Sequence, residues 1–245
     1  MTPRLLAGQR VLVTGAGRGL GVGFCQAIAA AGGRVLALGR DAGALAGLLE
    51  SLPGEGHDRL VADVTEPHQL EQALAGQRFN SLVNNAGIAI TARLQESSPE
   101  DIRRIIDTNL LGSLFTLQAS LPALRASGGG VVVNITSVLG HRPLAGAGIY
   151  AISKAALMQM TRAAAMELAA EKIRVNALAP GYVETEMNRH ILAGDAGEKL
   201  KKRIPLSRFA SAEDLVPALL LLLNPANSYM TGATLTIDGG MSAGL

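Results

Sequence analysis

Short apolar runs alternate with longer segments of helical periodicity along this chain of 245 residues. The apolar runs predict strands at residues 10–14, 34–38, 57–62, 81–85, 130–137, 173–179 and 234–237. The segments between them predict helices at residues 20–31, 42–52, 67–75, 99–124, 148–170 and 211–223. Regular alternation indicates βαβ units and a parallel sheet, and strands that are apolar throughout require helices on both faces. We therefore expect an α/β protein with a single-domain Rossmann fold over residues 1–245, built on a doubly wound, seven-stranded parallel sheet.

Composition argues against several other classes of protein. The 22 basic and 20 acidic residues nearly balance and aromatic residues make up 3%, so nothing indicates a nucleic-acid partner. Cys25 is the only cysteine and the four histidines lack metal-ligand spacing, so we expect no disulfide and no metal site. The most apolar stretch, residues 215–223, is about half as long as a bilayer requires. We expect a cytoplasmic protein without a membrane partner.

A glycine-rich loop, Thr14-Gly15-Ala16-Gly17-Arg18-Gly19-Leu20-Gly21, joins the first predicted strand to the first predicted helix. Free N–H groups at a helix N-terminus attract phosphate, and glycine lets the backbone turn tightly and approach a ligand. The loop therefore indicates a pyrophosphate site, although the same sequence also suits a tight turn without a ligand. A second motif, Asn84-Asn85-Ala86-Gly87, ends the fourth strand at the same edge of the sheet. Its asparagines suit either pinning a neighbouring loop or contacting a cofactor.

Tyr150 and Lys154 lie four residues apart in a predicted helix, and positions at that spacing share one face. The Lys154 ammonium can therefore lie beside the Tyr150 phenol, whose unperturbed pKa is about 10. Proton exchange near neutral pH requires a lower pKa, which a nearby cation favours. Such a pair alone is usually a surface pair. Together with Ser137 at the end of a strand and the glycine-rich loop, it indicates acid–base catalysis.

These motifs, in order from Thr14 to Gly240, resemble those of the short-chain dehydrogenase/reductase family across essentially the whole chain. The C-terminal third is similar to gluconate 5-dehydrogenases and to 3-oxoacyl-carrier-protein reductases. The resemblance implies an oxidoreductase that transfers a hydride between a nicotinamide cofactor and a small-molecule ketone or secondary alcohol, and it implies a homotetramer. Two alternatives stay open: an NAD-dependent polyol or sugar-acid dehydrogenase, and a cofactor-binding sensor or scaffold without turnover.

The resemblance also implies roles for individual residues. The catalytic tetrad would be Asn109, Ser137, Tyr150 and Lys154. Tyr150 would exchange a proton with the substrate oxygen, which Ser137 would stabilise. Lys154 would lower the Tyr150 pKa and hold the nicotinamide ribose, and Asn109 would anchor a proton-relay water. The cofactor would be contacted at the pyrophosphate by Gly15, Gly19, Leu20 and Gly21, at the adenine by Asp63 and Val64, at the adenosine ribose by Asn85, Ala86 and Gly87, and at the carboxamide by Pro180, Gly181, Val183 and Thr185.

The end of the second strand bears on the choice between NAD and NADP. Family members that use NAD commonly carry an acidic residue there, whereas this chain has Gly39 followed by Arg40. Arg40 and Arg18 suit a 2′-phosphate, because guanidinium geometry matches phosphate oxygens. Asp41 argues the other way, since a shift of one residue would aim its carboxylate at the ribose. We expect NADP(H) to be favoured over NAD(H).

Three further expectations concern segments outside these motifs. Residues 181–209 contain no clearly patterned element and are expected to form a substrate lid. Pro217 lies inside the last predicted helix and should kink it or shift its start. Cys25 has apolar neighbours in the first helix and is expected to be a buried structural thiol.

Overall fold

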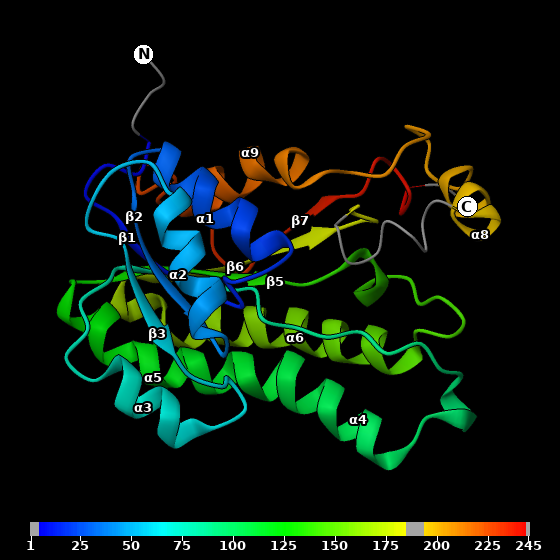
Figure 1. Ribbon diagram of the computed structural model, residues 1–245, viewed down its shortest axis with the longest axis horizontal. Coiled ribbons are helices and arrows are strands. Elements are labelled where there is room, and N and C mark those ends of the chain that lie inside the picture. The colour runs from blue at the N-terminus through cyan, green and yellow to red at the C-terminus, as the bar shows by residue number, and fades with distance from the viewer. Residues whose placement is uncertain (1–4, 185–193, 244–245) are drawn as a thin grey trace.

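Seven parallel strands form one sheet in the part of the chain that the structure, a computed structural model, describes: residues 5–184 and 194–243 (Figure 1). Their order across the sheet is β3-β2-β1-β4-β5-β6-β7. The strands are β1 (Arg10–Thr14), β2 (Arg34–Gly39), β3 (Asp58–Val61), β4 (Ser81–Asn84), β5 (Gly130–Ile135), β6 (Ile173–Pro180) and β7 (Thr234–Ile237). The α-helices are α1 (Leu20–Ala30), α2 (Ala42–Ser51), α3 (Pro67–Leu74), α4 (Pro99–Ile106), α5 (Gly112–Ala126), α6 (Gly148–Glu167), α8 (Asp195–Lys201) and α9 (Ala212–Leu223). The expected doubly wound α/β fold is confirmed.

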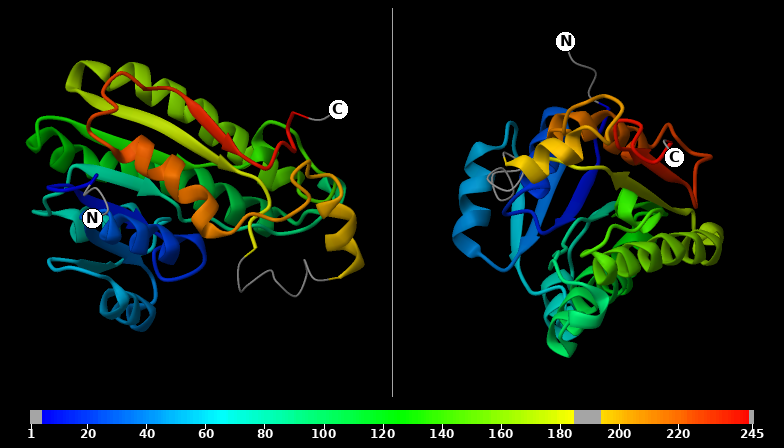
Figure 2. Two further views of the ribbon diagram at one scale, coloured as in Figure 1. Left: turned by 90° about the horizontal axis from the view of Figure 1, so that it is seen from above. Right: turned by 90° about the vertical axis from the view of Figure 1, so that its right-hand side faces the viewer.

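Helices cover both faces of the sheet, with α1, α2 and α9 above it and α3 to α6 below it in Figure 1. Two further views show the same layers (Figure 2). Neighbouring residues of a strand point to opposite faces. Val13 accordingly packs in the upper core with Phe24 and Leu219, whereas Leu12 packs in the lower core with Leu124. Both faces of the central strands β1, β2, β4, β5 and β6 are buried, which is why these strands are mostly apolar, whereas the edge strand β3 is largely exposed.

The strand order reverses between β1 and β4. From β1 the chain adds β2 and then β3 on one side, and it returns to add β4 on the other side of β1. The loops after β1 and β4 therefore separate at the carboxyl edge of the sheet and leave a crevice between them. In open α/β sheets, ligands bind at such a switch point. Both motifs that the sequence singled out, the glycine-rich loop and Asn84-Asn85-Ala86-Gly87, lie at this crevice.

One chain of polar side chains crosses the apolar interior. Asn84 of β4 is the register partner of Asn134 on β5. The Asn84 Nδ2 donates to Asn134 Oδ1 at 2.9 Å, and the Asn134 Nδ2 donates to Thr161 Oγ1 of α6 at 2.9 Å. All three residues are buried. The Asn84 Nδ2 also donates to the carbonyl of Ser113 at 3.1 Å.

The predicted helix at 99–124 begins at Pro99, capped by Ser98, but a π-helical turn at Asp107–Leu111 divides it into α4 and α5. Gly112 packs so closely on Val64 that an added Cβ would lie 2.8 Å from Val64 Cγ2. The π turn holds Asn109, whose side chain bonds the backbone of the loop after β4. The prediction of a single regular helix is thus wrong at the π turn Asp107–Leu111, because contacts with segments distant in the sequence determine the conformation of this turn.

Of the two outcomes expected for Pro217, a kink or a shifted start, the shifted start does not occur, and the kink stays a prediction. Helix α9 begins at Ala212 and contains Pro217 in its interior. A capping box fixes this start, because the Ser211 side chain accepts from the backbone N–H of Asp214 while the Asp214 carboxylate accepts from the backbone N–H of Ser211. Cys25 is buried as expected, and burial raises the pKa of its thiol to about 12.

Candidate active site

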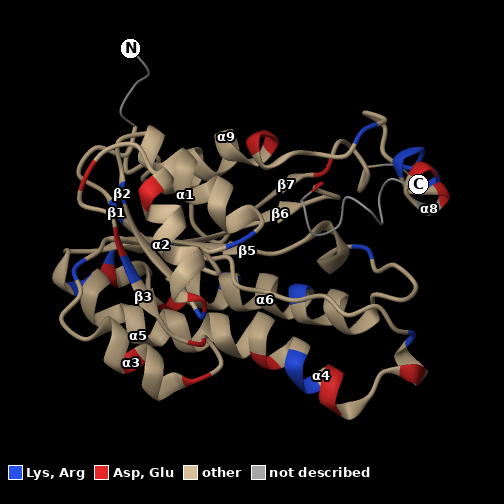
Figure 3. Ribbon diagram, viewed as in Figure 1, with Lys and Arg blue, Asp and Glu red and all other residues tan. Residues whose placement is uncertain are grey.

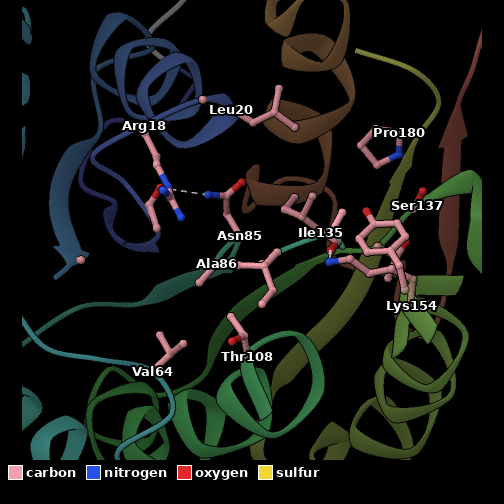
Figure 4. A pocket seen from close by; sticks show the side chains of 18 of the residues that line it. Arg18, Leu20, Val64, Asn85, Ala86, Thr108, Ile135, Ser137, Lys154 and Pro180 are labelled. Atoms are coloured by element: carbon pink, nitrogen blue, oxygen red, sulfur yellow. Dashed lines mark hydrogen bonds between the residues drawn. The ribbon is translucent and has the colours of Figure 1, made fainter. Parts of the chain in front are cut away.

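A cavity of about 1420 Å³ runs along the carboxyl ends of the strands, from the glycine-rich loop to the end of β6. In Figure 4, Arg18 and Asn85 lie toward one end of this cavity and Ser137, Lys154 and Pro180 toward the other. The predicted site residues that line it are Gly15, Arg18, Gly19, Leu20, Arg40, Asp63, Val64, Asn85, Ala86, Gly87, Ser137, Tyr150, Lys154, Pro180, Gly181 and Val183. Gly21 and Asn109 do not line the cavity, and Thr185 lies outside the described residues.

The glycine-rich loop fits a phosphate group. Gly15 has φ +62°, and a Cβ at Gly21 would lie 2.2 Å from the carbonyl oxygen of Gly15, so the turn tolerates no side chain there. Helix α1 begins at Leu20 with no side-chain cap and no acidic residue in its first turn. Its first N–H groups therefore have no side-chain acceptor and carry a partial positive charge toward the cavity. The exposed Arg18 adds a full positive charge beside them.

Asn85 ties the two loops of the crevice together. Its Nδ2 donates to the carbonyl of Thr14 at 2.9 Å and to that of Gly15 at 3.2 Å. In return, Thr14 Oγ1 accepts from the backbone N–H groups of Asn85 and Ala86, both at 3.0 Å. Of the two roles the sequence left open, the structure shows the pinning role for Asn85. Sequence reasoning missed Thr14, although its place directly before the first glycine is a usable signal.

The end of the cavity that Arg40, Asp41 and Asp63 line has a defined set of charges. Asp41 caps α2, where its Oδ1 accepts from the N–H groups of Gly43 and Ala44 at 2.9 and 3.0 Å. Arg40 instead points to Asp63, with 3.3 Å between Nη1 and Oδ2. Burial acts to raise the pKa of Asp63, but hydrogen bonds from Thr65 and the charge of Arg40 outweigh it and hold that pKa below its usual value.

Tyr150 and Lys154 project from the first turns of α6 toward Ser137, which follows β5. Tyr150 and Ser137 line the same end of the cavity, close enough for the Ser137 side chain to affect the pKa of the phenol. The Lys154 Nζ lies 5.7 Å from the centroid of the Tyr150 ring and donates to the carbonyl of Ile135 at 2.8 Å. The geometry therefore brings a phenol, a hydroxyl and an ammonium together at one end of the cavity.

The ionisation of this group differs from the sequence expectation. Burial raises the pKa of Tyr150 above its usual value and outweighs the hydrogen bond from Ser137, which lowers it. Burial also lowers the pKa of Lys154 to about 8. The expected downward shift of the Tyr150 pKa by Lys154 is thus absent from this arrangement. Its phenol is protonated at neutral pH, which is the form that donates a proton to a carbonyl oxygen.

Asn109 lies behind the cavity and is fully buried. Its Oδ1 accepts from the N–H of Ile88 at 2.8 Å, and its Nδ2 donates to the Ile88 carbonyl at 2.9 Å and to Ser153 Oγ at 3.0 Å. A Cβ on Gly87 would lie 3.3 Å from Asn109 Oδ1 and 3.4 Å from Lys154 Nζ, so this glycine separates the two side chains. The Asn109 amide thus fixes the loop after β4 against α6. The water that the resemblance implies at Asn109 stays a prediction, and no local pattern marks Ser153.

The segment after β6 is anchored on the C-terminal strand. The N–H of Gly181 donates to the carbonyl of Ile237 at 2.9 Å, and a Cβ on Gly181 would lie 2.7 Å from the Cα of Asp238. Tyr182 and Val183 follow and line the cavity. Of the expected lid at 181–209, residues 185–193 lie outside the described part, and α8 lies within the rest.

The described residues include no helix with the length and hydropathy of a membrane span. Within residues 5–184 and 194–243, no three His, Cys, Asp or Glu side chains gather in a way that could hold a metal ion.

The switch-point crevice, the glycine-rich loop and the Ser–Tyr–Lys group define an oxidoreductase of the dinucleotide-binding type. A family model described as enoyl-(acyl carrier protein) reductase matches residues 15–242. Carbonyl reductase family member 4 of Danio rerio is 38% identical over 237 residues, 94% of this chain and 96% of the relative. Galactitol 2-dehydrogenase (L-tagatose-forming) of Cereibacter sphaeroides is 38% identical over 243 residues, 96% of this chain and 95% of the relative.

Among solved structures, a gluconate 5-dehydrogenase from Burkholderia cenocepacia J2315 in complex with NADP and tartrate is similar, with a TM-score of 0.93 at 32% identity. The match covers 100% of this chain and 99% of that one. The chain belongs to the short-chain dehydrogenase/reductase family, and the resemblance read from its motifs is confirmed. It is therefore a dehydrogenase or reductase that acts on alcohol and ketone groups.

Proposed function

We propose that this protein transfers a hydride between NADP(H) and a ketone or secondary alcohol, with Tyr150 as the general acid and base. The convergence of the Tyr150 phenol, the Ser137 hydroxyl and the Lys154 ammonium at one end of the cavity carries this proposal. A carbonyl oxygen between these two hydroxyls would receive the proton of Tyr150 and a stabilising hydrogen bond from Ser137. The nicotinamide supplies the hydride when it is bound. Lys154, which lines the same end of the cavity, would hold the ribose of the nicotinamide.

Two features support NADP(H) over NAD(H). Arg40 and Arg18 both line the adenosine and phosphate end of the cavity, and each can make charge-assisted hydrogen bonds to a 2′-phosphate. Asp41, the residue that argued for NAD, has its carboxylate engaged by the N-terminus of α2. The similar gluconate 5-dehydrogenase structure holds NADP.

A second candidate is an NAD-dependent polyol or sugar-acid dehydrogenase. The similarity to galactitol 2-dehydrogenase favours a polyol. The Asp63 carboxylate, which pairs with Arg40, adds a negative charge that disfavours a phosphate at this end of the cavity. A sensor or scaffold without turnover is the weaker alternative, because Ser137, Tyr150 and Lys154 are all in place.

Four broader proposals accompany the activity. The protein acts as a homotetramer in the cytoplasm, and its single thiol is buried, as suits a protein without disulfides. Residues 1–245 form one domain, and residues 181–209 border the substrate, since Tyr182 and Val183 line the cavity.

Replacement of Tyr150 by Phe tests the function directly. The phenyl ring keeps the packing but has no proton to exchange, so kcat should fall by a factor of about 100 to 10,000. NADPH binding, followed by its fluorescence, should stay within about threefold. A Tyr150→Phe protein that keeps its turnover of ketones would contradict the proposed role. A wild-type protein that turns over no member of a broad ketone and alcohol panel would contradict the proposed activity.

A further inference from the structure

Tyr182 is a second phenol at the reacting end of the cavity, and the roles derived so far do not use it. It lines the main cavity and also a neighbouring cavity of about 110 Å³, so its side chain separates the two. Tyr182 and Tyr150 both line the main cavity, and the Tyr182 phenol adds to the effect of burial, which raises the pKa of Tyr150. Burial raises the pKa of Tyr182 as well and outweighs the charge of Arg203, which lowers it.

The hydroxyl of Tyr182 is buried, yet no hydrogen-bond partner meets it among the described residues. A buried hydroxyl without a partner costs free energy, because it has lost its bonds to water and gained none in return. Most buried phenols in folded proteins have a partner, so an exception calls for a specific explanation. In a cavity-lining residue, the simplest explanation is that the partner is a ligand.

The backbone of Tyr182 is fixed, so its side chain has a defined direction. Its carbonyl accepts from the N–H of Ala210 at 2.9 Å, and Val183 pairs with Ala210 in a parallel bridge. On the other side, Gly181 packs directly against Asp238 at the end of β7. Tyr182 is therefore held by two separate segments of the chain, which is the support that a selective contact requires.

We propose that Tyr182 is a specificity-determining residue whose hydroxyl bonds a second oxygen of the substrate, beyond the carbonyl that Ser137 and Tyr150 hold. The preferred substrate is then an oxygenated ketone, with a hydroxyl or carbonyl one or two carbons from the reacting carbon, rather than a plain ketone. This inference rests on the proposed function and adds the class of substrate to it. A site that bonds a substrate oxygen discriminates against analogues that lack it, since its own polar group is then left unpaired.

The three tyrosines of the chain provide a matched experiment. Each is replaced by Phe, and kcat and KM are measured with NADPH for butan-2-one, 3-hydroxybutan-2-one and 4-hydroxybutan-2-one. In Tyr182→Phe, kcat/KM should fall about tenfold for at least one hydroxyketone, which is the effect of one lost hydrogen bond, and less than threefold for butan-2-one. Tyr229→Phe is the control, because Tyr229 is fully exposed, and it should leave kcat/KM unchanged for all three substrates. Tyr150→Phe should lose activity toward all three ketones.

The melting temperature separates a substrate contact from a structural one. Removal of a hydroxyl that has no partner should leave the melting temperature of Tyr182→Phe unchanged or raise it. A fall of several degrees would show that the hydroxyl bonds the protein itself and would overturn the inference. If kcat/KM of Tyr182→Phe falls equally for the plain and the hydroxylated ketones, or falls for neither, the inference would be overturned as well. Either result would leave the proposed function intact. Absence of any turnover by the wild-type protein would overturn both.

Discussion

Lys154 is a buried cation, and its burial predicts how stability depends on pH. Its pKa is lowered to about 8 in the folded protein, whereas an unfolded lysine keeps a value near 10.4. Between these values the unfolded chain binds more protons than the folded one, so stability rises as pH increases. Burial of the charged Lys154 side chain destabilises the folded protein to its full extent below about pH 8. This destabilisation is relieved as pH rises from about 8 to 10.4. Its size is about 3 kcal/mol at most.

Replacement of Lys154 by Met isolates this contribution. Urea unfolding at several pH values should show wild-type stability rising relative to Lys154→Met between about pH 8 and 10.4. All other titrating groups are shared by the two proteins, so their contributions cancel in the difference. Parallel stability curves for the two proteins would show that Lys154 titrates normally in the folded state.

A second prediction at the scale of the residue concerns Arg40 and Arg18 and the binding of NADPH. Arg40→Ala and Arg18→Ala should each weaken NADPH binding about tenfold, because one charge-assisted contact to phosphate contributes about 1.5–3 kcal/mol. NADH binding should change less than threefold, and Arg78→Ala, which removes an exposed arginine that does not line the cavity, is the control. The measurement is a fluorescence titration with each cofactor. Tighter binding of NADH than of NADPH by the wild-type protein would reverse the assigned preference.

Sequence reasoning located residues that line the cavity better than it located their pairings. It named Arg40 and Asp41 as competing contacts for the ribose end but gave no means to rank them. The structure shows that Asp41 is the N-cap of α2. That role has a local signal, an aspartate directly before a helix. By contrast, the pairing of Arg40 with Asp63 joins the ends of two adjacent strands and has no signature in either segment.

At the scale of the element, the turn from β1 to α1 depends on the absence of a side chain at Gly21. In Gly21→Ala the new Cβ would meet backbone atoms of Gly15 and Ala16, which cannot move aside as a flexible side chain would. We expect a loss of stability of about 1–3 kcal/mol, as for other overpacked sites, and weaker NADPH binding. Chemical denaturation and cofactor titration measure the two effects.

Gly47 supplies the matched control for that substitution. It also lies in a helix, α2, but nothing lies within 4 Å of the Cβ that it would gain. Alanine is a better helix former than glycine, so Gly47→Ala should stabilise the protein by about 0.5–1 kcal/mol. Similar destabilisation by both substitutions would mean that the close packing at Gly21 is not the cause.

The helices that could be predicted are those with local signals at their ends. Ser211 and Asp214 form a capping box, a pattern that is local in the sequence, and α9 begins where that box requires. The π turn at Asp107–Leu111 had no such signal. It depends on the contact between Gly112 and Val64 and on bonds from Asn109 to Ile88, residues that lie far apart in the sequence.

At the scale of the whole molecule, the outer face of α6 indicates self-association. Ile152 is 53% exposed and Met166 82% exposed, and small residues such as Ala155 and Ala163 are exposed between them. Charged residues are sparse on α6, whereas both signs gather on α4 (Figure 3). An exposed apolar stripe at helical spacing is typical of an interface between helices.

The expected assembly is a homotetramer, with a mass of about 101 kDa as four times the 25.3 kDa chain. Size-exclusion chromatography with light scattering should give this mass for the wild-type protein. Ile152→Glu and Met166→Glu should shift it toward smaller species, because a charge buried at an interface is costly. Val61→Glu changes an equally exposed apolar residue on β3, at an edge of the sheet, and should leave the mass unchanged. A wild-type mass of 25 kDa would rule out the assembly.

The buried amides of Asn84 and Asn134 have a consequence for how the sheet aligns. Strands that are apolar on both faces carry little information about their register, since a slipped pairing still buries apolar side chains on either side. In a pairing slipped by one residue, Asn84 would face Val133 or Ile135 and its amide would lose its bond to Asn134, a cost of about 1–3 kcal/mol. One polar pair thus distinguishes the native alignment of β4 and β5 from its neighbours, as a single buried asparagine does in coiled coils. Since β4 leads to Asn85 and β5 leads to Ser137, the same pair also aligns the two halves of the active site.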